Sequence, residues 1–312
     1  MAEQPDWRFC VKCQVLFYDG YNDKGHCPAD DGEHARAGYH FVLPHDVPEA
    51  PTSQAAWRFC DKCFVLFFDG YEDKKTCPVG DRQHRAAGFQ FVLPHDVNGE
   101  WDSQTEWRFC IKCQALFYNG YPNPGRCAGG DLHQAAGFHF VLPYYAAQPG
   151  PIADRWQQYG GLTGPLGAAV GRAGPNGAAY QFTAAPGLYQ GFENGAVAWT
   201  PNQGRNMTVA IYEQAGRAVL DWGTTDPWNY DRFIVRWSLT TSDQPLPLDR
   251  WSQADVSTGI FHPRTWGSFT LPSPPGGIGS SEGWCYYAIV EGYDNDGDSD
   301  QGWTYPVRHR IR

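Results

Sequence analysis

Nine of the ten cysteines in this 312-residue chain follow one pattern, Cys-x2-Cys-x13-Cys, that occurs three times at intervals of 50 residues. A histidine follows the third cysteine of each copy after five or six residues. Thiolate and imidazole groups are the donors that zinc prefers in a closed tetrahedral site, and three cysteines with one histidine satisfy one ion completely. The sequence therefore predicts three structural zinc sites. Their ligands are Cys10, Cys13, Cys27 and His34; Cys60, Cys63, Cys77 and His84; and Cys110, Cys113, Cys127 and His133.

The histidine of each site is identified by comparing the three copies with one another. Only the set His34, His84 and His133 is complete, and each member lies four residues before a Gly-aromatic-x-Phe-Val-Leu-Pro segment. This holds although the third copy has lost one residue just upstream. The other histidines of the repeats recur in at most two copies, so we do not expect them to bind metal: His26, His40, His45, His95 and His139.

Other arrangements of these residues fit the counts less well. One disulfide in each copy leaves three thiols, and nine cysteines cannot all pair without Cys285. An iron site would more naturally use four thiolates and no imidazole. A catalytic zinc needs an open coordination position and usually a carboxylate base. Asp31 and Asp81 precede their histidines by three residues, but the third copy has Gly130 there. We therefore expect a structural metal.

Each copy carries the same apolar frame around its cysteines, with Trp-x-Phe before the first and Leu-Phe after the second. This alternation predicts a hairpin with the Cys-x2-Cys pair at its turn, and residues 39–44 predict a further strand that ends at a proline. A unit of about 40 residues buries too little apolar surface to fold stably without a bound metal or disulfide bonds. The copies resemble zinc ribbons, and also a tandem Trp-x-x-Cys-x-Lys-Cys-x-x-Leu-Phe repeat of secreted and surface proteins of bacteria and fungi. The latter resemblance implies no activity.

The composition bounds the partners of the protein. Lys and Arg number 24 against 34 Asp and Glu, a net charge of −10, which argues against nucleic acid because a phosphate backbone requires a basic surface. No apolar run approaches a membrane span, and the first residues lack a signal-peptide pattern. Aromatic residues make up 15% of the chain and glycines number 36, a composition typical of loop-rich β proteins whose surfaces stack on sugars or partner proteins.

Small residues, glycine and proline dominate residues 146–205. Gly-Pro-Leu-Gly at 164–167, Phe-Glu-Asn-Gly-x-x-x-Trp at 192–199 and the upstream Ile152 and Trp156 resemble the LGFP repeat of actinobacterial cell-wall proteins. The name-giving Leu-Gly-Phe/Tyr-Pro of that family is Leu-Gly-Ala-Ala here. The resemblance implies a noncatalytic module associated with the envelope or with glycans. Gly195 is expected to permit a tight turn before a strand that contains Val197 and Trp199.

Residues 206–312 contain short alternating apolar runs separated by turn residues, at 207–211, 218–222, 233–237, 268–271 and 286–293. This number of strands in about 100 residues predicts a β-sandwich. The region resembles a fibronectin type III or related immunoglobulin-like domain in its Leu-x-Trp at 220–222, Tyr-x-Ile at 287–289 and final segment 303–310. Cys285 is left without a partner, and we expect it to be a buried or lone thiol.

Carboxylates alternate along residues 294–300, which gives a candidate calcium site with Asp294, Asp296, Asp298 and Asp300 as ligands. The spacing differs from that of an EF-hand loop. Asp, Asn and Gly are also favoured in a hairpin turn between the last two strands, so a plain turn is the alternative.

No His-Glu-x-x-His or phosphate-binding glycine loop occurs. The pattern Gly-x-Ser-x-Gly occurs at 279–283, but a predicted strand follows it where a nucleophile elbow requires a helix, so we expect no enzymatic activity. The predicted fold is mostly β and multi-domain, with three zinc-ribbon-like modules (1–46, 51–96, 101–145), an LGFP-like module (146–205) and a sandwich (206–312).

The predicted function is that of a noncatalytic binding or adhesion protein of a cell surface or extracellular assembly, which recognises a glycan, a cell-wall component or a protein. Export would be non-classical or follow removal of a leader; a cytoplasmic location is the alternative. The alternative function is a structural subunit that self-assembles, as a homo-oligomer, into a filament or injection-type particle.

Overall fold

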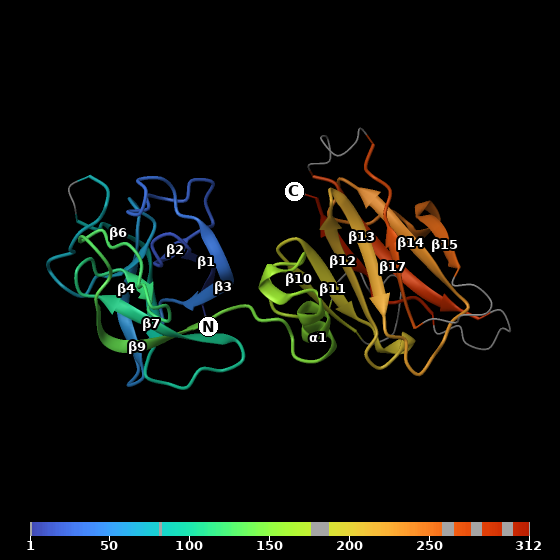
Figure 1. Ribbon diagram of the computed structural model, residues 1–312, viewed down its shortest axis with the longest axis horizontal. Helices are drawn as coiled ribbons and strands as arrows, with labels where there is room; N and C mark the ends of the chain where they lie inside the picture. The colour runs from blue at the N-terminus through green and yellow to red at the C-terminus, as the bar shows by residue number, and fades with distance from the viewer. Residues whose placement is uncertain are drawn as a thin grey trace. The chain divides into compact units, whose positions relative to one another are not determined.

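The computed structural model describes residues 2–80, 83–175, 187–257, 265–275, 283–294 and 302–311. The chain forms two compact units, Met1–Ala146 and Ala147–Arg312. The regular structure of both units is mostly β-strand, as predicted (Figure 1). All three cysteine repeats lie in the first unit, called the N-terminal unit below, and the remainder of the chain forms the C-terminal unit.

Each repeat of the N-terminal unit folds into an antiparallel sheet of three strands, with the strand that precedes the cysteines in the middle. The sheet orders are β2-β1-β3, β5-β4-β6 and β8-β7-β9. The strands are β1 (Glu3–Cys10), β2 (Leu16–Tyr18), β3 (Arg36–Pro44), β4 (Ser53–Cys60), β5 (Leu66–Phe68), β6 (Ala86–Pro94), β7 (Ser103–Cys110), β8 (Leu116–Tyr118) and β9 (Ala135–Pro143).

The predicted hairpin is confirmed in every repeat. In the first, Trp7 pairs with Tyr18 and Phe9 with Leu16, and the Cys-x2-Cys pair lies at the turn between them. The strand predicted at 39–44 begins earlier, at Arg36, because a bulge accommodates the extra residues. At this bulge Gly38 has a φ of 70°, a conformation that glycine adopts without steric cost.

The three repeats share one core, so they are not separate beads. A tryptophan of each repeat packs edge-to-face on a phenylalanine of another, with ring centroids 5.0–5.1 Å apart. These pairs are Trp7–Phe91, Trp57–Phe140 and Trp107–Phe41. Backbone hydrogen bonds follow the same cyclic order, from Tyr18 N to Phe64 O, Phe68 N to Gln114 O, and Tyr118 N to Gln14 O. The repeats therefore close into a ring with approximate threefold symmetry.

Aromatic stacking at the strand ends explains why some histidines of the repeats recur only twice. His45 stacks on Phe89 of the second repeat at 3.8 Å, and His95 stacks on Phe138 of the third at 3.7 Å. In the third repeat Tyr144 takes this place and stacks on Tyr39 at 3.8 Å. The position requires a flat ring, which imidazole and phenol both supply.

In its described residues, the C-terminal unit contains two antiparallel sheets, of orders β10-β11-β12-β13-β16 and β15-β14-β17-β18 (Figure 1). The strands are β10 (Leu188–Phe192), β11 (Gly195–Trp199), β12 (Thr208–Gln214), β13 (Arg217–Gly223), β14 (Arg232–Thr240), β15 (Ser252–Ser257), β16 (Trp266–Thr270), β17 (Cys285–Tyr293) and β18 (Val307–Arg310). The helical segments are α1 (Pro151–Gln158) and the short 3-10 turns η1 (Gly161–Thr163), η3 (Pro201–Gln203) and η4 (Leu248–Arg250).

The two sheets of this unit enclose a common apolar core, to which Leu220 and Trp222 contribute from one sheet and Val235 and Val290 from the other. A domain boundary was predicted between residues 205 and 206. In the structure β11, on one side of that boundary, pairs along its whole length with β12, on the other. The LGFP-like segment thus supplies two strands of the sandwich, and one unit contains both predicted modules.

The role predicted for Gly195 differs in the structure. A Cβ atom at this position would lie 2.1 Å from the carbonyl oxygen of Ile211 in the neighbouring strand. Glycine is therefore required by the close approach of β12 and not by the turn. The elements that were not predicted include the helix α1, the strand β10 and the edge strand β15, whose Ser-Gln-Ala-Asp-Val-Ser sequence has only two apolar residues.

Candidate metal centres

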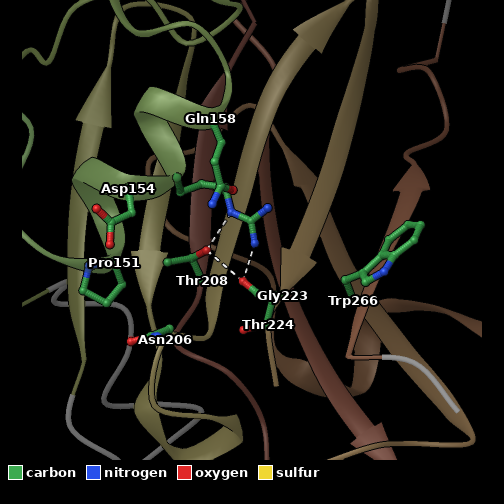
Figure 2. A pocket seen from close by; sticks show the side chains of 9 residues that line it. Pro151, Asp154, Gln158, Asn206, Thr208, Gly223, Thr224 and Trp266 are labelled. Carbon is green, nitrogen blue, oxygen red and sulfur yellow. Dashed lines mark hydrogen bonds between the residues drawn. The ribbon is translucent and has the colours of Figure 1, made fainter. Parts of the chain in front are cut away.

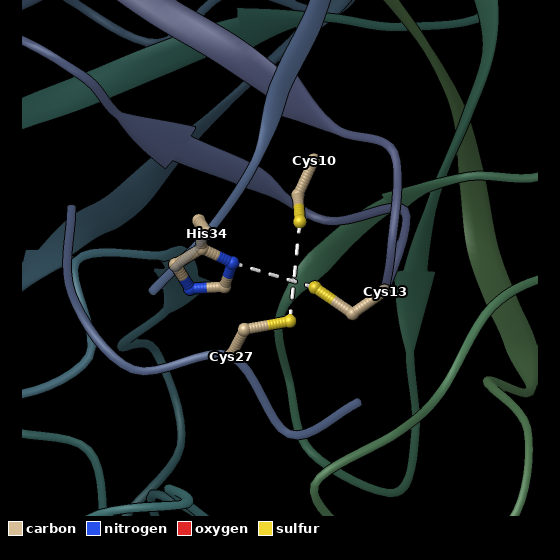
Figure 3. Close-up of side chains that lie close together, drawn as sticks. All are labelled: Cys10, Cys13, Cys27 and His34. Carbon is tan, nitrogen blue, oxygen red and sulfur yellow. Dashed lines mark hydrogen bonds between the residues drawn. The ribbon is translucent and has the colours of Figure 1, made fainter. Parts of the chain in front are cut away.

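Each of the three predicted ligand sets converges in the structure, with all four donor atoms within 4.8 Å of one another. Figure 3 shows the first set, in which the three sulfur atoms and the imidazole point toward one centre. The Sγ atoms of Cys10 and Cys27 lie 4.0 Å apart, and Cys13 Sγ lies 3.4 Å from His34 Nδ1. Tetrahedral zinc would place sulfurs about 3.8 Å apart and sulfur and nitrogen about 3.6 Å apart.

The hairpin and two flanking loops position these ligands. Cys10 ends β1, and its backbone N–H and C=O bond to Val15 and Gln14, which folds the turn that carries Cys13. Cys27 comes from the loop after β2, and His34 from the segment that leads into β3. The same placement recurs in the other repeats, where the Cys63–His84 and Cys113–His133 distances are 3.5 and 3.6 Å.

The chemistry of the donor set fits a divalent cation. All nine cysteines are reduced and buried, so the disulfide alternative does not occur among them. Hydrogen bonds from Cys13 and Cys27 lower the pKa of the Cys10 thiol strongly. Burial raises the pKa of Cys13, and the hydrogen bond with Cys10 raises the pKa of Cys27 to about 11. Three thiolates cannot form together in this buried space without a cation, and a bound metal reverses that preference.

A lysine between the paired cysteines braces the loop that carries the histidine. Lys12 Nζ lies 2.8 Å from Asp30 Oδ1 and donates to the carbonyl of Glu33, next to His34. In the third repeat Lys112 donates to the carbonyl of Leu132 at 2.8 Å, next to His133. This lysine therefore fixes the position of the fourth ligand.

The second nitrogen of each ligating histidine reaches into another repeat. His34 Nε2 donates to the carbonyl oxygen of Cys63 at 3.1 Å. This bond assigns the proton to Nε2 and leaves the Nδ1 lone pair for a metal. Phe17 stacks on the imidazole at 4.8 Å and limits its rotation. The equivalent hydrogen bonds are His84 to Cys113 at 3.0 Å and His133 to Cys13 at 3.2 Å.

The arginine of the Trp-Arg-Phe segment behaves differently from its sequence-based interpretation. From the sequence, two basic residues in each repeat, such as Arg8 and Lys12, are expected on a solvated face of the hairpin, but Arg8 is only 2% exposed. Its guanidinium donates to the carbonyl of Gly38 at 3.1 Å, at the bulge of β3. Arg58 and Arg108 make the same bond to Gly88 and Gly137. Strict recurrence beside the cysteines was the one sequence signal for this role.

No family model, curated protein or solved structure matches this chain. The zinc-ribbon, LGFP-like and fibronectin-like identities therefore stay predictions, while the three Cys3His clusters are a direct observation.

The predicted calcium ligands Asp296, Asp298 and Asp300 lie outside the described residues. Asp294 is described, and its carboxylate accepts a hydrogen bond from the backbone of Asp231 at 3.2 Å. Cys285 is fully buried in β17, and burial raises the pKa of its thiol. None of the helices in the described part of the chain has the length and apolar character needed to cross a membrane.

Proposed function

We propose that this chain is a noncatalytic binding protein whose N-terminal unit is held together by three structural zinc ions. The observation that carries the proposal is the complete donor set of each cluster. Four protein donors fill a tetrahedral zinc, and the ligand residues are at most 6% exposed. Such a site leaves no position for a water molecule or a substrate.

The role of the metal follows from the size of the repeats. Each repeat supplies only one small three-stranded sheet, and two of its ligands lie on loops outside that sheet. Zinc fixes both loops against the hairpin, and the histidine then bonds the next repeat. The metal thus contributes directly to the free energy of folding, as in other small zinc-dependent modules.

Support for a binding role comes from an exposed tyrosine that occurs once in each of the three repeats. Tyr21, Tyr71 and Tyr121 occupy equivalent positions and are 53–55% exposed, although each ring packs edge-on against aromatic residues at its base. Exposed aromatic side chains stack on the apolar faces of sugars and on protein partners. We propose a glycan, a cell-wall component or a protein as the partner, in an extracellular or cell-surface setting.

Metal analysis by mass spectrometry of the purified chain tests the structural proposal. We expect about three zinc ions per chain, one for each cluster. Fewer than two ions per chain, or iron in place of zinc, would contradict the proposal.

A glycan array combined with light scattering tests the binding proposal. Saturable binding by a monomeric chain supports it. Growth in size with concentration, without binding of a glycan or a protein ligand, supports self-assembly into a filament or particle instead.

A further inference from the structure

A cavity of about 360 Å³ opens in the C-terminal unit between α1 and the five-stranded sheet. Its volume lies in the range of small-molecule binding sites, which hold part of a ligand in a preformed concave surface. Figure 2 shows Asp154 and Gln158 of α1 at one side of the cavity and Trp266, the first residue of β16, at the other. Asn206 lies below them in the same view.

The floor of the cavity is rigid because Arg155 and Tyr159 fasten α1 and the turn after it to the sheet. The Nε atom of Arg155 donates to Thr208 Oγ1 at 2.8 Å, and its Nη2 atom donates to the carbonyl of Gly223. One turn later, Tyr159 donates through its hydroxyl to Asp221 Oδ2 at 3.0 Å. The cavity is therefore present before any ligand arrives.

The edge of the cavity carries an aromatic platform. Trp266 pairs with Gly223 across β13 and β16, so its side chain lies on the sheet face that α1 covers further along. The indole is 55% exposed. A Cβ atom at Gly223 would lie 2.7 Å from the Cβ atom of Trp266, so only glycine leaves room for the indole at this place.

The polar groups of the lining are chemically mixed. Among the described residues of the lining are one carboxylate (Asp154), one guanidinium (Arg155), two amides (Gln158 and Asn206) and two hydroxyl groups (Thr208 and Thr224). The two charges cancel, and the guanidinium is already bonded to the protein on two sides, so the lining does not select an anion. Amides and carboxylates that surround a solvent-exposed indole match a ligand with many hydroxyl groups and one apolar face.

We propose that this cavity binds a neutral saccharide, with one pyranose ring stacked on Trp266 and its hydroxyl groups bonded to Asp154, Gln158 and Asn206. The inference rests on the proposed binding function and narrows it to one site and one class of ligand. It assigns recognition of neutral saccharides to this cavity, in addition to the exposed tyrosines of the N-terminal unit, and leaves the zinc ions a purely structural role.

An array of neutral linear oligosaccharides, with oligomers of glucose, N-acetylglucosamine, mannose, xylose and galactose, tests the site with the full-length chain. Titration calorimetry then compares variants with the oligosaccharide that binds. We expect Trp266→Ala and Asp154→Ala each to weaken binding about tenfold or more. The matched control is Trp228→Ala, since Trp228 is 41% exposed in the same unit and does not line the cavity.

Circular dichroism of every variant checks folding, and Asp154→Ala on the exposed face of α1 keeps the test decisive if Trp266→Ala fails to fold. Wild-type affinity in both cavity variants overturns the site but leaves the binding function standing. If the wild-type chain binds no neutral saccharide and stays monomeric in light scattering, the saccharide inference is wrong while a protein ligand is still open. Concentration-dependent growth without ligand binding overturns both proposals.

Discussion

The imidazole Nε2 of His133 donates a hydrogen bond of 3.2 Å to the carbonyl oxygen of Cys13, a residue 120 positions earlier in the chain. Both residues are candidate metal ligands, but they belong to different clusters. The bond joins the last repeat to the first and completes a circle that His34 and His84 begin. Each metal centre is therefore linked to the next through one imidazole, and the three centres form one structure.

Removal of zinc tests this linkage most directly. Structural zinc contributes on the order of 10 kcal/mol to the folding of small modules, so we expect a chelator to unfold the N-terminal unit and leave the C-terminal unit folded. Maleimide labelling followed by intact-mass measurement is the readout. Without chelator no cysteine should react, with chelator the nine cluster cysteines should react together, and Cys285 should react only in denaturant. Labelling in groups of three would show that the repeats unfold independently.

Replacement of His133 can separate its role as a metal ligand from its hydrogen bond to the next repeat. His133→Cys supplies a fourth thiolate, so we expect the chain to retain all three zinc ions. It loses the bond to Cys13 and the stacking on Phe117 at 4.7 Å, which should lower stability by about 1–2 kcal/mol. Calorimetric melting of the N-terminal unit, with zinc measured in the same sample, gives both numbers.

The matched variant is His133→Ala, which removes the ligand as well and should lower the zinc content to two or fewer. An unchanged melting temperature in His133→Cys, at full zinc content, would mean that the bond to Cys13 does not couple the centres.

The shared core predicts that a mutation in one repeat destabilises all three. Trp57 is fully buried and packs on Phe140 and Phe109 of the third repeat, at 5.0 and 6.3 Å. Trp57→Ala should therefore cost about 3–5 kcal/mol and lower the single unfolding transition of the whole unit. Trp101→Ala is the control, because Trp101 is 54% exposed on a linker of the same unit. Two separate transitions in Trp57→Ala would contradict a common core.

The metal ligands were predictable from the sequence because chemistry fixes both their types and their number. A tetrahedral ion needs four donors. Comparison of the three copies excluded the remaining histidines of the repeats as metal ligands. The hairpins followed from the alternation of Trp7 and Phe9 with the turn at the cysteines. These features involve residues that lie close together in the sequence, so one sequence is enough to predict them.

The closure of the repeats was not predictable, because it depends on contacts between residues far apart in the chain. The sequences of the linkers around Pro48 and Asn98 are compatible with three separate modules and also with a closed ring. Only the packing between repeats, such as that of Trp7 on Phe91, distinguishes the two arrangements. The domain boundary predicted between residues 205 and 206 also depends on contacts that the sequence does not reveal. Composition changes there, but the backbone of β12 continues the sheet of β11, and hydrogen-bonded pairing leaves no mark on composition.

Alkaline pH should destabilise the C-terminal unit through its buried tyrosines. Burial raises the pKa of Tyr189, Tyr286 and Tyr287 to about 12, from an ordinary value of 10.0. A raised pKa in the folded state means that the unfolded chain releases these protons first. The stabilisation is complete below pH 10 and is lost as the pH rises toward 12, since the unfolded state then binds fewer protons than the folded state.

Denaturant titrations of the C-terminal transition between pH 8 and 12 measure this dependence. Tyr286→Phe keeps the buried ring but removes one ionisable group, so the fall in unfolding free energy with pH should become shallower by about one proton's share. Tyr293→Phe is the control, because Tyr293 lies at the end of β17 and is only half-buried. If Tyr286→Phe and the wild-type chain lose stability with the same slope, Tyr286 does not retain its proton in the folded state, and the alkaline sensitivity has another source.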